Sequence, residues 1–180
     1  MVFSLAAYGI LLAGCREKAE SQVLNKGIQY VNKGMYEEAI KELDRAIQIN
    51  PRSDRAYYNR ARAYAAKGAV QQAITDYSKT IDINWVASIQ SAYNNRGLLY
   101  EKLGNFDSAL SDYTKGIEVL ANPKFSGYRR FKAVLLANRA SLYLKRKDYD
   151  NAWADVRSVK RMGFEVEPDL LNSLKRASRK

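Results

Sequence analysis

The side chains that most often carry enzyme chemistry are few in this sequence. Its 180 residues include no histidine and a single cysteine, Cys15, so the chain offers neither a His general base nor a Cys/His set for zinc. It also lacks the phosphate-binding pattern G-x-x-x-x-G-K-[ST] and the nucleophile pattern G-x-S-x-G. We therefore expect a non-enzymatic protein with no catalytic residues, no metal and no cofactor.

Carboxylates are numerous, but they recur in a pattern typical of structure. In four places a basic residue lies sixteen residues before an acidic one, namely Lys26 and Glu42, Arg60 and Asp76, Arg96 and Asp112, and Arg139 and Asp155. Two packed helices would use such a pair to satisfy opposed charges where they meet. We expect these four pairs to be structural ion pairs and not catalytic dyads.

The same fourfold repetition indicates which elements hold these pairs. Segments beginning at Val23, Tyr57, Tyr93 and Leu136 align in one register, with a small residue three before a Tyr and twelve before an Ala. Within each segment, apolar residues recur three and four apart over about 14 residues, stop at a turn and resume. Each copy is therefore expected to form a helical hairpin. Because one hairpin cannot bury its apolar face alone, neighbouring hairpins should stack.

These segments resemble the tetratricopeptide repeat, a unit of about 34 residues with the pattern W-x2-L-G-x2-Y, then A-x3-F, then P. The small position is occupied by Gly27, Ala61, Gly97 and Ala140, and the closing Pro occurs only at Pro51. The resemblance covers about Glu20 to Gly163. It implies an all-α fold, a right-handed superhelical solenoid of about four helical hairpins followed by a C-terminal capping helix.

The spacing between copies sets the expected domain bounds. The repeats are predicted at about 20–53, 54–87, 90–123 and 133–166, followed by a capping helix and basic tail at 167–180. Two extra residues fall near Asn84 to Ser88, and nine more fall in Leu120 to Lys132, where Pro123 and Gly127 interrupt the helical pattern. We expect surface loops at both insertions, with contact to a partner as the alternative.

The resemblance also implies where a ligand would bind. In the family, the first helix of each repeat lines a concave groove, and its sixth position is often an Asn that bonds the backbone of an extended peptide. The chain has Asn at this position in every repeat, and the predicted groove consists of Asn25, Arg55, Tyr58, Asn59, Arg62, Asn94, Asn95 and Asn138. An amide is both donor and acceptor, so it can hold a peptide main chain. The alternative is that these Asn residues serve local packing.

Upstream of the repeats, residues 1–14 are uncharged and end in Leu12-Ala13-Gly14 before Cys15. This resembles a bacterial lipoprotein signal peptide, which implies cleavage before Cys15, lipidation of its sulfur, and a short tether at 15–19. The expected location is then the cell envelope, with the periplasmic face of the outer membrane favoured in a Gram-negative organism. The alternatives are a plain secretory signal, and a buried apolar helix on a cytosolic protein.

Charge is unevenly distributed along the chain. The formal net charge is +11, and residues 124–180 hold 15 basic and 6 acidic residues, a net of +9. A basic end suggests attraction to anionic lipid head groups, an anionic polymer or an acidic protein, although a merely solvated face explains it equally well. Nucleic acid would be a natural partner in a cytosolic chain, and we do not expect it if Cys15 is lipidated outside the cytoplasm.

Together these patterns predict a scaffold anchored at the bacterial cell envelope that binds a peptide or protein in its concave groove. Two alternatives stay open: a binder of an anionic polymer or membrane surface through the basic C-terminal third, and a cytosolic adaptor if the N-terminus is not processed. The salt dependence of binding separates the groove from the charged surface, because binding driven by counterion release collapses with ionic strength.

Overall fold

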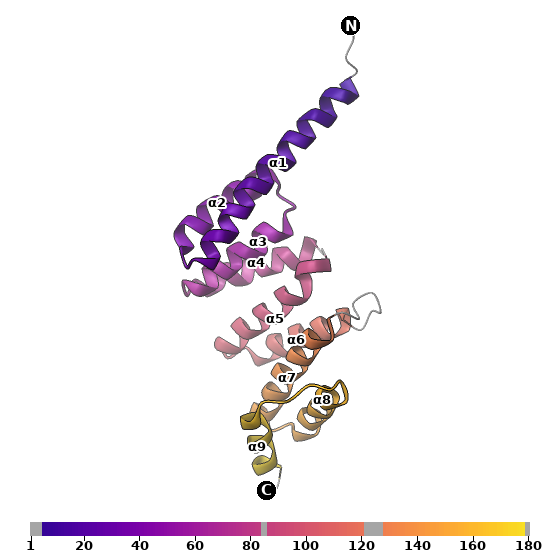
Figure 1. Cartoon of the computed structure of the whole chain (residues 1–180). Helices are drawn as coiled ribbons and strands as arrows, with labels where there is room; N and C mark the ends of the chain where they lie inside the picture. Colours follow the sequence, from indigo (N-terminus) through magenta and orange to yellow (C-terminus); the bar gives the residue numbers. More distant parts are fainter. Residues whose placement is uncertain (1–4, 84–85, 121–127, 179–180) are drawn as a thin grey trace. The chain divides into compact units, whose positions relative to one another are not determined.

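The structure, a computed structural model, describes residues 5–83, 86–120 and 128–178, which form helices joined by turns and short connections and contain no strand. The side chains of residues 5–13, 86 and 87 lie outside the description. The helices are α1 (Leu5–Asn32), α2 (Tyr36–Ile49), α3 (Asp54–Ala66), α4 (Val70–Ile83), α5 (Val86–Lys102), α6 (Phe106–Val119), α7 (Arg129–Lys145), α8 (Tyr149–Arg161) and α9 (Pro168–Ala177) (Figure 1). The predicted all-α class is confirmed.

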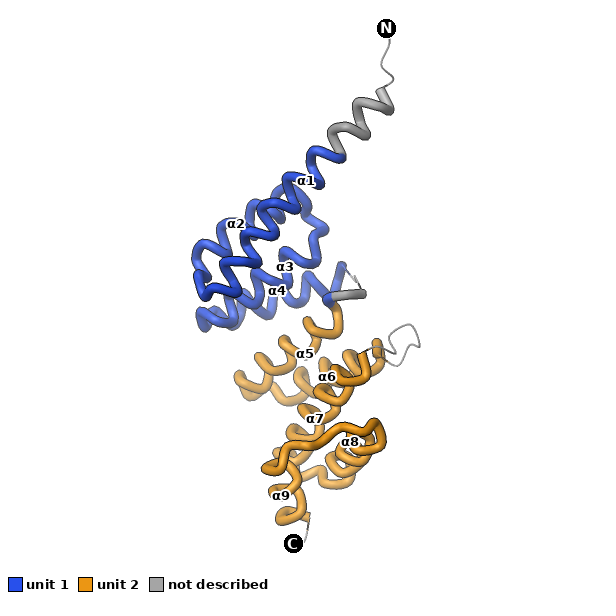
Figure 2. The backbone as a smooth tube through the Cα atoms, in the orientation of Figure 1, with its two compact units in different colours: residues 1–88 blue, residues 89–180 orange. Residues whose placement is uncertain are grey.

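These helices form two compact units, residues 1–88 and residues 89–180 (Figure 2). In unit 1, α1 packs on α2, α3 packs on α4, and α2 lies against α3. In unit 2, α7 packs on α8, α6 lies against α7, and α9 covers part of α8. Each unit therefore contains consecutive helical hairpins, as the repeated pattern predicts.

The turns inside the hairpins share one backbone feature. Gly34, Gly68 and Gly104 all have positive φ, between 74° and 80°, a conformation that glycine adopts without a Cβ clash. The fourth hairpin places Lys147 at the corresponding point with φ 60°. The turn between α7 and α8 thus keeps the geometry of the other three but loses the residue type that suits it.

The small residue of each repeat permits close helix packing. A Cβ added to Gly27 would lie 2.7 Å from Cγ of Leu43, and one added to Gly97 would lie 2.7 Å from Cε1 of Tyr113. Both Leu43 and Tyr113 are fully buried. The side chain nearest the small position is therefore the bulky one sixteen residues on, and not that of the Ala twelve residues on.

α5 and α7, like α1, begin before the bounds predicted for their repeats. α5 begins at Val86 and α7 at Arg129, so residues 129–132, expected to belong to an inserted loop, instead form the first turn of α7. The breakers Pro123 and Gly127 precede this stretch, and Arg-Arg-Phe-Lys contains no residue that would stop a helix. Residues 84–85 of the first predicted insertion and 121–127 of the second lie outside the described residues.

The predicted capping helix is present as α9. Pro168 is at its first turn, where a missing N–H costs nothing. Leu174 is completely buried in a cluster with Val156, Val159 and Val166. This one side of α9 covers the apolar face that the last hairpin would otherwise expose.

Candidate functional site

The four predicted ion pairs are confirmed. The shortest nitrogen–oxygen distances are 2.7 Å for Lys26–Glu42, 2.7 Å for Arg60–Asp76, 2.7 Å for Arg96–Asp112 and 2.8 Å for Arg139–Asp155. The three Arg residues each contact both oxygens of their Asp, and these three Asp side chains are almost fully buried. Each pair joins the two helices of one hairpin and so serves the scaffold.

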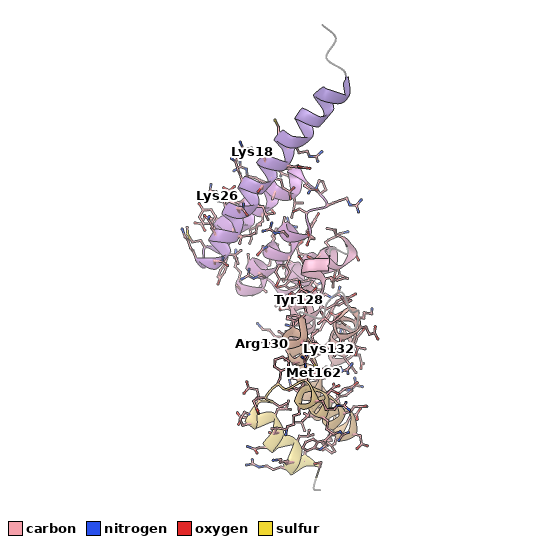
Figure 3. The ribbon with its side chains drawn as sticks, turned by 45° about the vertical axis from the view of Figure 1, so that its right-hand side comes forward. Lys18, Lys26, Tyr128, Arg130, Lys132 and Met162 are labelled. Atoms are coloured by element: carbon pink, nitrogen blue, oxygen red, sulfur yellow. The ribbon has the colours of Figure 1, made fainter. Side chains whose placement is uncertain are left out.

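Lys26 differs from its three counterparts. It projects from α1 with its side chain 52% exposed, whereas the Arg60 side chain is 19% exposed (Figure 3). Glu42 also accepts a hydrogen bond from Arg45 at 3.0 Å. The Lys26–Glu42 pair is thus partly exposed to water, and Arg45 is a second cation beside Glu42.

Aromatic rings complete the surroundings of these cations. The guanidinium of Arg60 lies 5.5 Å from the ring centre of Tyr57 and 5.9 Å from that of Tyr64. Burial works against the charged form of Arg60, but the hydrogen bonds that it donates to Asp76 and Asp44 raise its pKa above the ordinary value. The sequence analysis missed these cation–π contacts, although Tyr three before and four after Arg60 was a visible signal, since such residues share one helix face.

In unit 1, the predicted groove residues are largely used by the protein itself. The Asn59 amide is buried, donates to the carbonyl of Arg55 at 2.8 Å, and accepts from Nη1 of Arg62 at 3.0 Å. The Tyr58 ring lies 5.8 Å from that of Tyr77. Asn25 is exposed, and its amide donates to Oγ of Ser21 at 3.4 Å. For Asn59, local packing therefore explains the amide.

A cavity of about 330 Å³ in unit 1 takes in one of the predicted groove residues. Arg55 lines it together with Glu17, Glu20, Ser21, Leu24, Asn50, Arg52, Ser53 and Asp54. Asn50 donates to Glu20 at 2.8 Å across this cavity region, joining the end of α2 to α1. Asn25, Tyr58, Asn59 and Arg62 do not line it.

In unit 2, the predicted amides come together. Nδ2 of Asn138 donates to Oδ1 of Asn94 at 2.9 Å, and Nδ2 of Asn94 donates to Oδ1 of Asn95 at 3.2 Å. The chain of amides links the first helices of two consecutive hairpins, α5 and α7. Asn94 is buried, while Asn138 keeps partial exposure.

Beside Asn138 lies a cavity of about 570 Å³. One wall is α7, and the other is formed by Val159 of α8 and the segment 162–167 that connects α8 to α9. The lining residues are Arg130, Ala133, Val134, Ala137, Asn138, Val159, Phe164, Glu165 and Glu167. Val134 is 42% exposed, so it presents apolar surface to this cavity.

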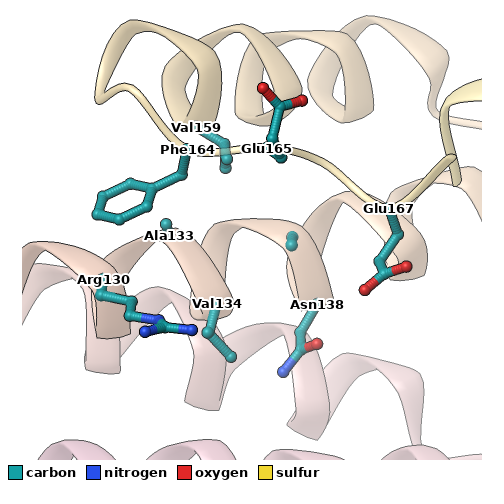
Figure 4. Close-up of a pocket in the computed structure, with 9 residues that line it drawn as sticks. Arg130, Ala133, Val134, Asn138, Val159, Phe164, Glu165 and Glu167 are labelled. Carbon is teal, nitrogen blue, oxygen red and sulfur yellow. The ribbon is translucent and has the colours of Figure 1, made fainter.

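Charged and apolar side chains lie at different places along this cavity (Figure 4). Arg130, Val134 and Asn138 follow one another four residues apart along one face of α7, and Phe164 lies across from the start of this row. The Glu167 carboxylate points toward α7 near Asn138, whereas that of Glu165 points away. An apolar trough therefore runs between a cationic end at Arg130 and an anionic end at Glu167.

Of the predicted groove residues, only Asn138 lines this larger cavity. The sequence reasoning missed Arg130, Val134, Phe164 and Glu167, because the connection after Gly163 was assigned to the edge of repeat four. Val134 carried a signal, since it occupies the place where Arg55 stands in repeat two, and an apolar residue there has no role inside its own hairpin.

Around Cys15, α1 runs from Leu5 to Asn32 without interruption. Residues 15–19, predicted as a short tether after lipidation of Cys15, are therefore helical. Cys15 is exposed, and Nε of Arg16 donates to the carbonyl of Ile49 at 2.6 Å. Within the described residues, no helix has the length and apolarity needed to span a bilayer, and no cluster of three or more Asp, Glu or Cys could hold a metal ion.

Three models of protein families match segments of this chain. A family model described as "TPR repeat" matches residues 27–68, and models described as "Tetratricopeptide repeat" match residues 54–84 and 91–122. The chain is built from tetratricopeptide repeats. Its fourth predicted repeat, 133–166, lies outside the matched segments, but α7 and α8 reproduce the hairpin and its ion pair.

Several solved structures share the fold of this chain at less than 25% sequence identity. MamA is 23% identical, with a TM-score of 0.69 over 88% of this chain and 85% of that chain. The Yersinia enterocolitica type III secretion chaperone SycD, solved with a peptide of the translocator YopD, is 17% identical, with a TM-score of 0.64 over 70% and 93%. Pseudomonas aeruginosa PilF is 17% identical, with a TM-score of 0.71 over 90% and 68%. No curated protein sequence matches this chain significantly.

Proposed function

We propose that this tetratricopeptide-repeat protein is a non-enzymatic scaffold that binds an extended peptide segment of a partner protein. The observation that carries the proposal is the cavity beside α7, where exposed Val134 lies between Arg130 and Asn138, and partly buried Phe164 lies across from the Arg130 end. An apolar trough with a charge at each end suits a peptide that offers an apolar side chain between polar groups. The fold of SycD, which was solved with a bound peptide, supports this use of the fold.

The Asn94–Asn138 pair adds backbone recognition to this cavity. Oδ1 of Asn138 accepts no hydrogen bond within the described part of the chain, so it is available to a peptide N–H. In unit 1, Arg55 lines a smaller cavity with two Glu residues. We assign the main binding role to unit 2, because its cavity is larger and exposes apolar side chains.

The test is a peptide selection from a displayed library on the wild-type protein, followed by affinity measurements on two variants. Val134→Asp places a charge in the trough. Leu103→Asp is the matched control, since Leu103 is 55% exposed in unit 2 and does not line the cavity. Burying a Val contributes about 1.5–3 kcal/mol, so selected peptides should bind Val134→Asp about tenfold or more weakly and Leu103→Asp normally. Equal losses in both variants, or a library that yields no binder, would reject the proposal.

We propose further that the scaffold is anchored to the bacterial cell envelope through lipidated Cys15, on the periplasmic side of an outer membrane where one exists. Leu12-Ala13-Gly14-Cys15 resembles a lipobox, and Cys15 is exposed. The contacts of α1 described above begin at Arg16, so removing residues 1–14 would leave them in place. A lipid on Cys15 would then hold unit 1 close to the membrane, because a helix rises only about 1.5 Å per residue.

Intact mass spectrometry of the protein recovered from its native membrane fraction tests the anchor. Loss of residues 1–14 with an acyl mass on Cys15 would support it, and more than one acyl chain would explain stable attachment. A soluble chain that keeps residues 1–14 would instead favour the cytosolic adaptor.

A further inference from the structure

A second cavity of unit 2 is separate from the peptide trough. It measures about 390 Å³ and lies where α6, α7 and α8 meet, lined by Ile117, Arg129, Lys132, Leu136, Arg139, Asp155, Ser158, Arg161 and Met162. None of these residues lines the trough beside Val134. Lys132 and Met162, from α7 and from the end of α8, are labelled in Figure 3.

The cavity combines an apolar floor with a strongly cationic rim. Ile117, Leu136 and Met162 supply the apolar side chains, and four of the other lining residues are Lys or Arg. Arg139 is neutralised by its two contacts with Asp155, both 2.8 Å long. The remaining cations are Arg129, Lys132 and Arg161.

These three cations keep their charge available. Nη2 of Arg129 donates to the carbonyl of Met162 at 3.0 Å, and Nη2 of Arg161 donates to Oγ of Ser158 at 3.1 Å. Both acceptors are neutral, so the hydrogen bonds orient the guanidinium groups without cancelling their charge. Within the described residues, neither these two Arg nor Lys132 forms an ion pair.

Within the described residues, the carboxylates of Asp155 and Glu118 do not neutralise the positive charge of the rim. Asp155 is buried and held by Arg139. Glu118 acts electrostatically on Arg139, but it is exposed and does not line the cavity. The cavity is therefore a concave site with an excess of positive charge, which differs from the exposed basic residues of α9, Lys175 and Arg176, that border none of the cavities described here.

We propose that this cavity binds a phosphate group carried by a small molecule or a lipid head group. Two Arg forks and a Lys match the geometry and charge of phosphate oxygens. Guanidinium groups already oriented by hydrogen bonds lose less conformational freedom on binding. The apolar floor accommodates the organic part of the ligand, and the volume is at the lower end of the range of small-molecule sites.

The test compares two double variants that remove the same charge from unit 2. Lys132→Ala/Arg161→Ala removes two of the three rim cations and leaves Arg129, its contact with Met162 and the structural pair Arg139–Asp155 in place. Lys175→Ala/Arg176→Ala is the control on the exposed surface of α9. Circular dichroism first establishes that both variants are folded.

Binding is then measured with inorganic pyrophosphate by calorimetry, and with vesicles of phosphatidylcholine alone or mixed with phosphatidylglycerol by co-sedimentation. We expect the rim variant to lose about tenfold or more in affinity for one of these phosphate probes, because it loses two charge-assisted contacts, and the control to stay within about twofold. Loss of pyrophosphate binding indicates a soluble phosphate ligand, and loss of phosphatidylglycerol binding alone indicates a lipid head group.

Two results would overturn the site. If both variants lose affinity equally, binding depends on diffuse charge and not on the cavity. If the wild-type protein binds neither pyrophosphate nor phosphatidylglycerol vesicles, the cavity takes no phosphate. Because none of the altered residues lines the peptide trough, peptide binding should persist in both variants.

Discussion

Replacing Arg60 by Met should destabilise unit 1 far more than replacing Lys26 by Met. Both residues tie the two helices of a hairpin through a carboxylate sixteen residues on, at 2.7 Å in each case. Met keeps an unbranched apolar side chain that can still pack between Tyr57 and Tyr64, so the change mainly removes the charge. The comparison therefore measures how burial changes the contribution of such an ion pair to the free energy of unfolding.

The magnitude follows from how little water reaches each pair. The Asp76 side chain is 4% exposed, and without Arg60 it would be left as a buried charge. At an effective dielectric constant of about 20, unit charges about 4 Å apart attract by about 4 kcal/mol, and removing one partner of a buried pair costs about 3–5 kcal/mol. Lys26 is half exposed and Glu42 retains Arg45, so the loss on replacing Lys26 should be much the smaller of the two.

Urea unfolding followed by circular dichroism measures both variants against the wild-type protein. A third variant, Arg60→Met/Asp76→Leu, removes the stranded carboxylate and should recover part of the lost stability. Asp44, the second partner of Arg60, is 43% exposed and tolerates the change. Peptide affinity per folded molecule should be unchanged, because Arg60 lines none of the cavities described above.

Equal losses for Arg60→Met and Lys26→Met would refute the reasoning, since burial would then not determine the value of the pair. A double variant no more stable than Arg60→Met would show that the stranded Asp76 charge is not the cause. A binding defect in folded Arg60→Met would reassign the pair from structure to function.

Two further predictions concern unit 2. Burial and a 2.6 Å hydrogen bond to Glu101 raise the pKa of Tyr113 well above its ordinary value. Above about pH 10 the unfolded chain therefore releases this proton while the folded chain keeps it, and the free energy of unfolding falls by up to about 1.4 kcal/mol per pH unit. Tyr113→Phe should reduce this alkaline loss of stability in urea unfolding, and an unchanged dependence on pH would contradict the prediction. Lys147→Gly should stabilise unit 2 by about 1 kcal/mol in the same assay, because Lys147 has φ 60°, a backbone conformation that strains every residue with a Cβ except in special cases and that glycine adopts freely. A similar gain from Lys147→Ala would show that backbone strain is not responsible.

Much of the fold could be predicted from the sequence because its contacts are local. The hairpins, their glycine turns, the ion pairs at a spacing of sixteen and the capping helix all follow from patterns within about 34 residues, the length of one repeat. The bounds of α5 and α7 were less predictable, because a loop and the first turn of a helix differ little in composition, as in residues 129–132.

The candidate site was harder to predict because it depends on contacts between repeats. Asn at the sixth position suggested one role in every repeat, yet Asn59 donates to Arg55 of its own helix, whereas Asn138 donates to Asn94 of the preceding hairpin. Identical residues at identical positions therefore have different partners. The neighbouring side chains, which the repeat pattern does not specify, decide which amide stays available.

By itself, the sequence determined the repeat, its helices and the ion pairs between them, since each depends on spacing along one hairpin. Only the tertiary structure decided where the cavities lie. The trough beside Val134 needs the connection after α8 to pass along α7, and the cationic cavity needs Arg129 and Lys132 of α7 to meet Arg161 of α8. Such sites form where segments from different parts of the chain pack together, and the repeat pattern of the sequence does not specify which side chains then meet.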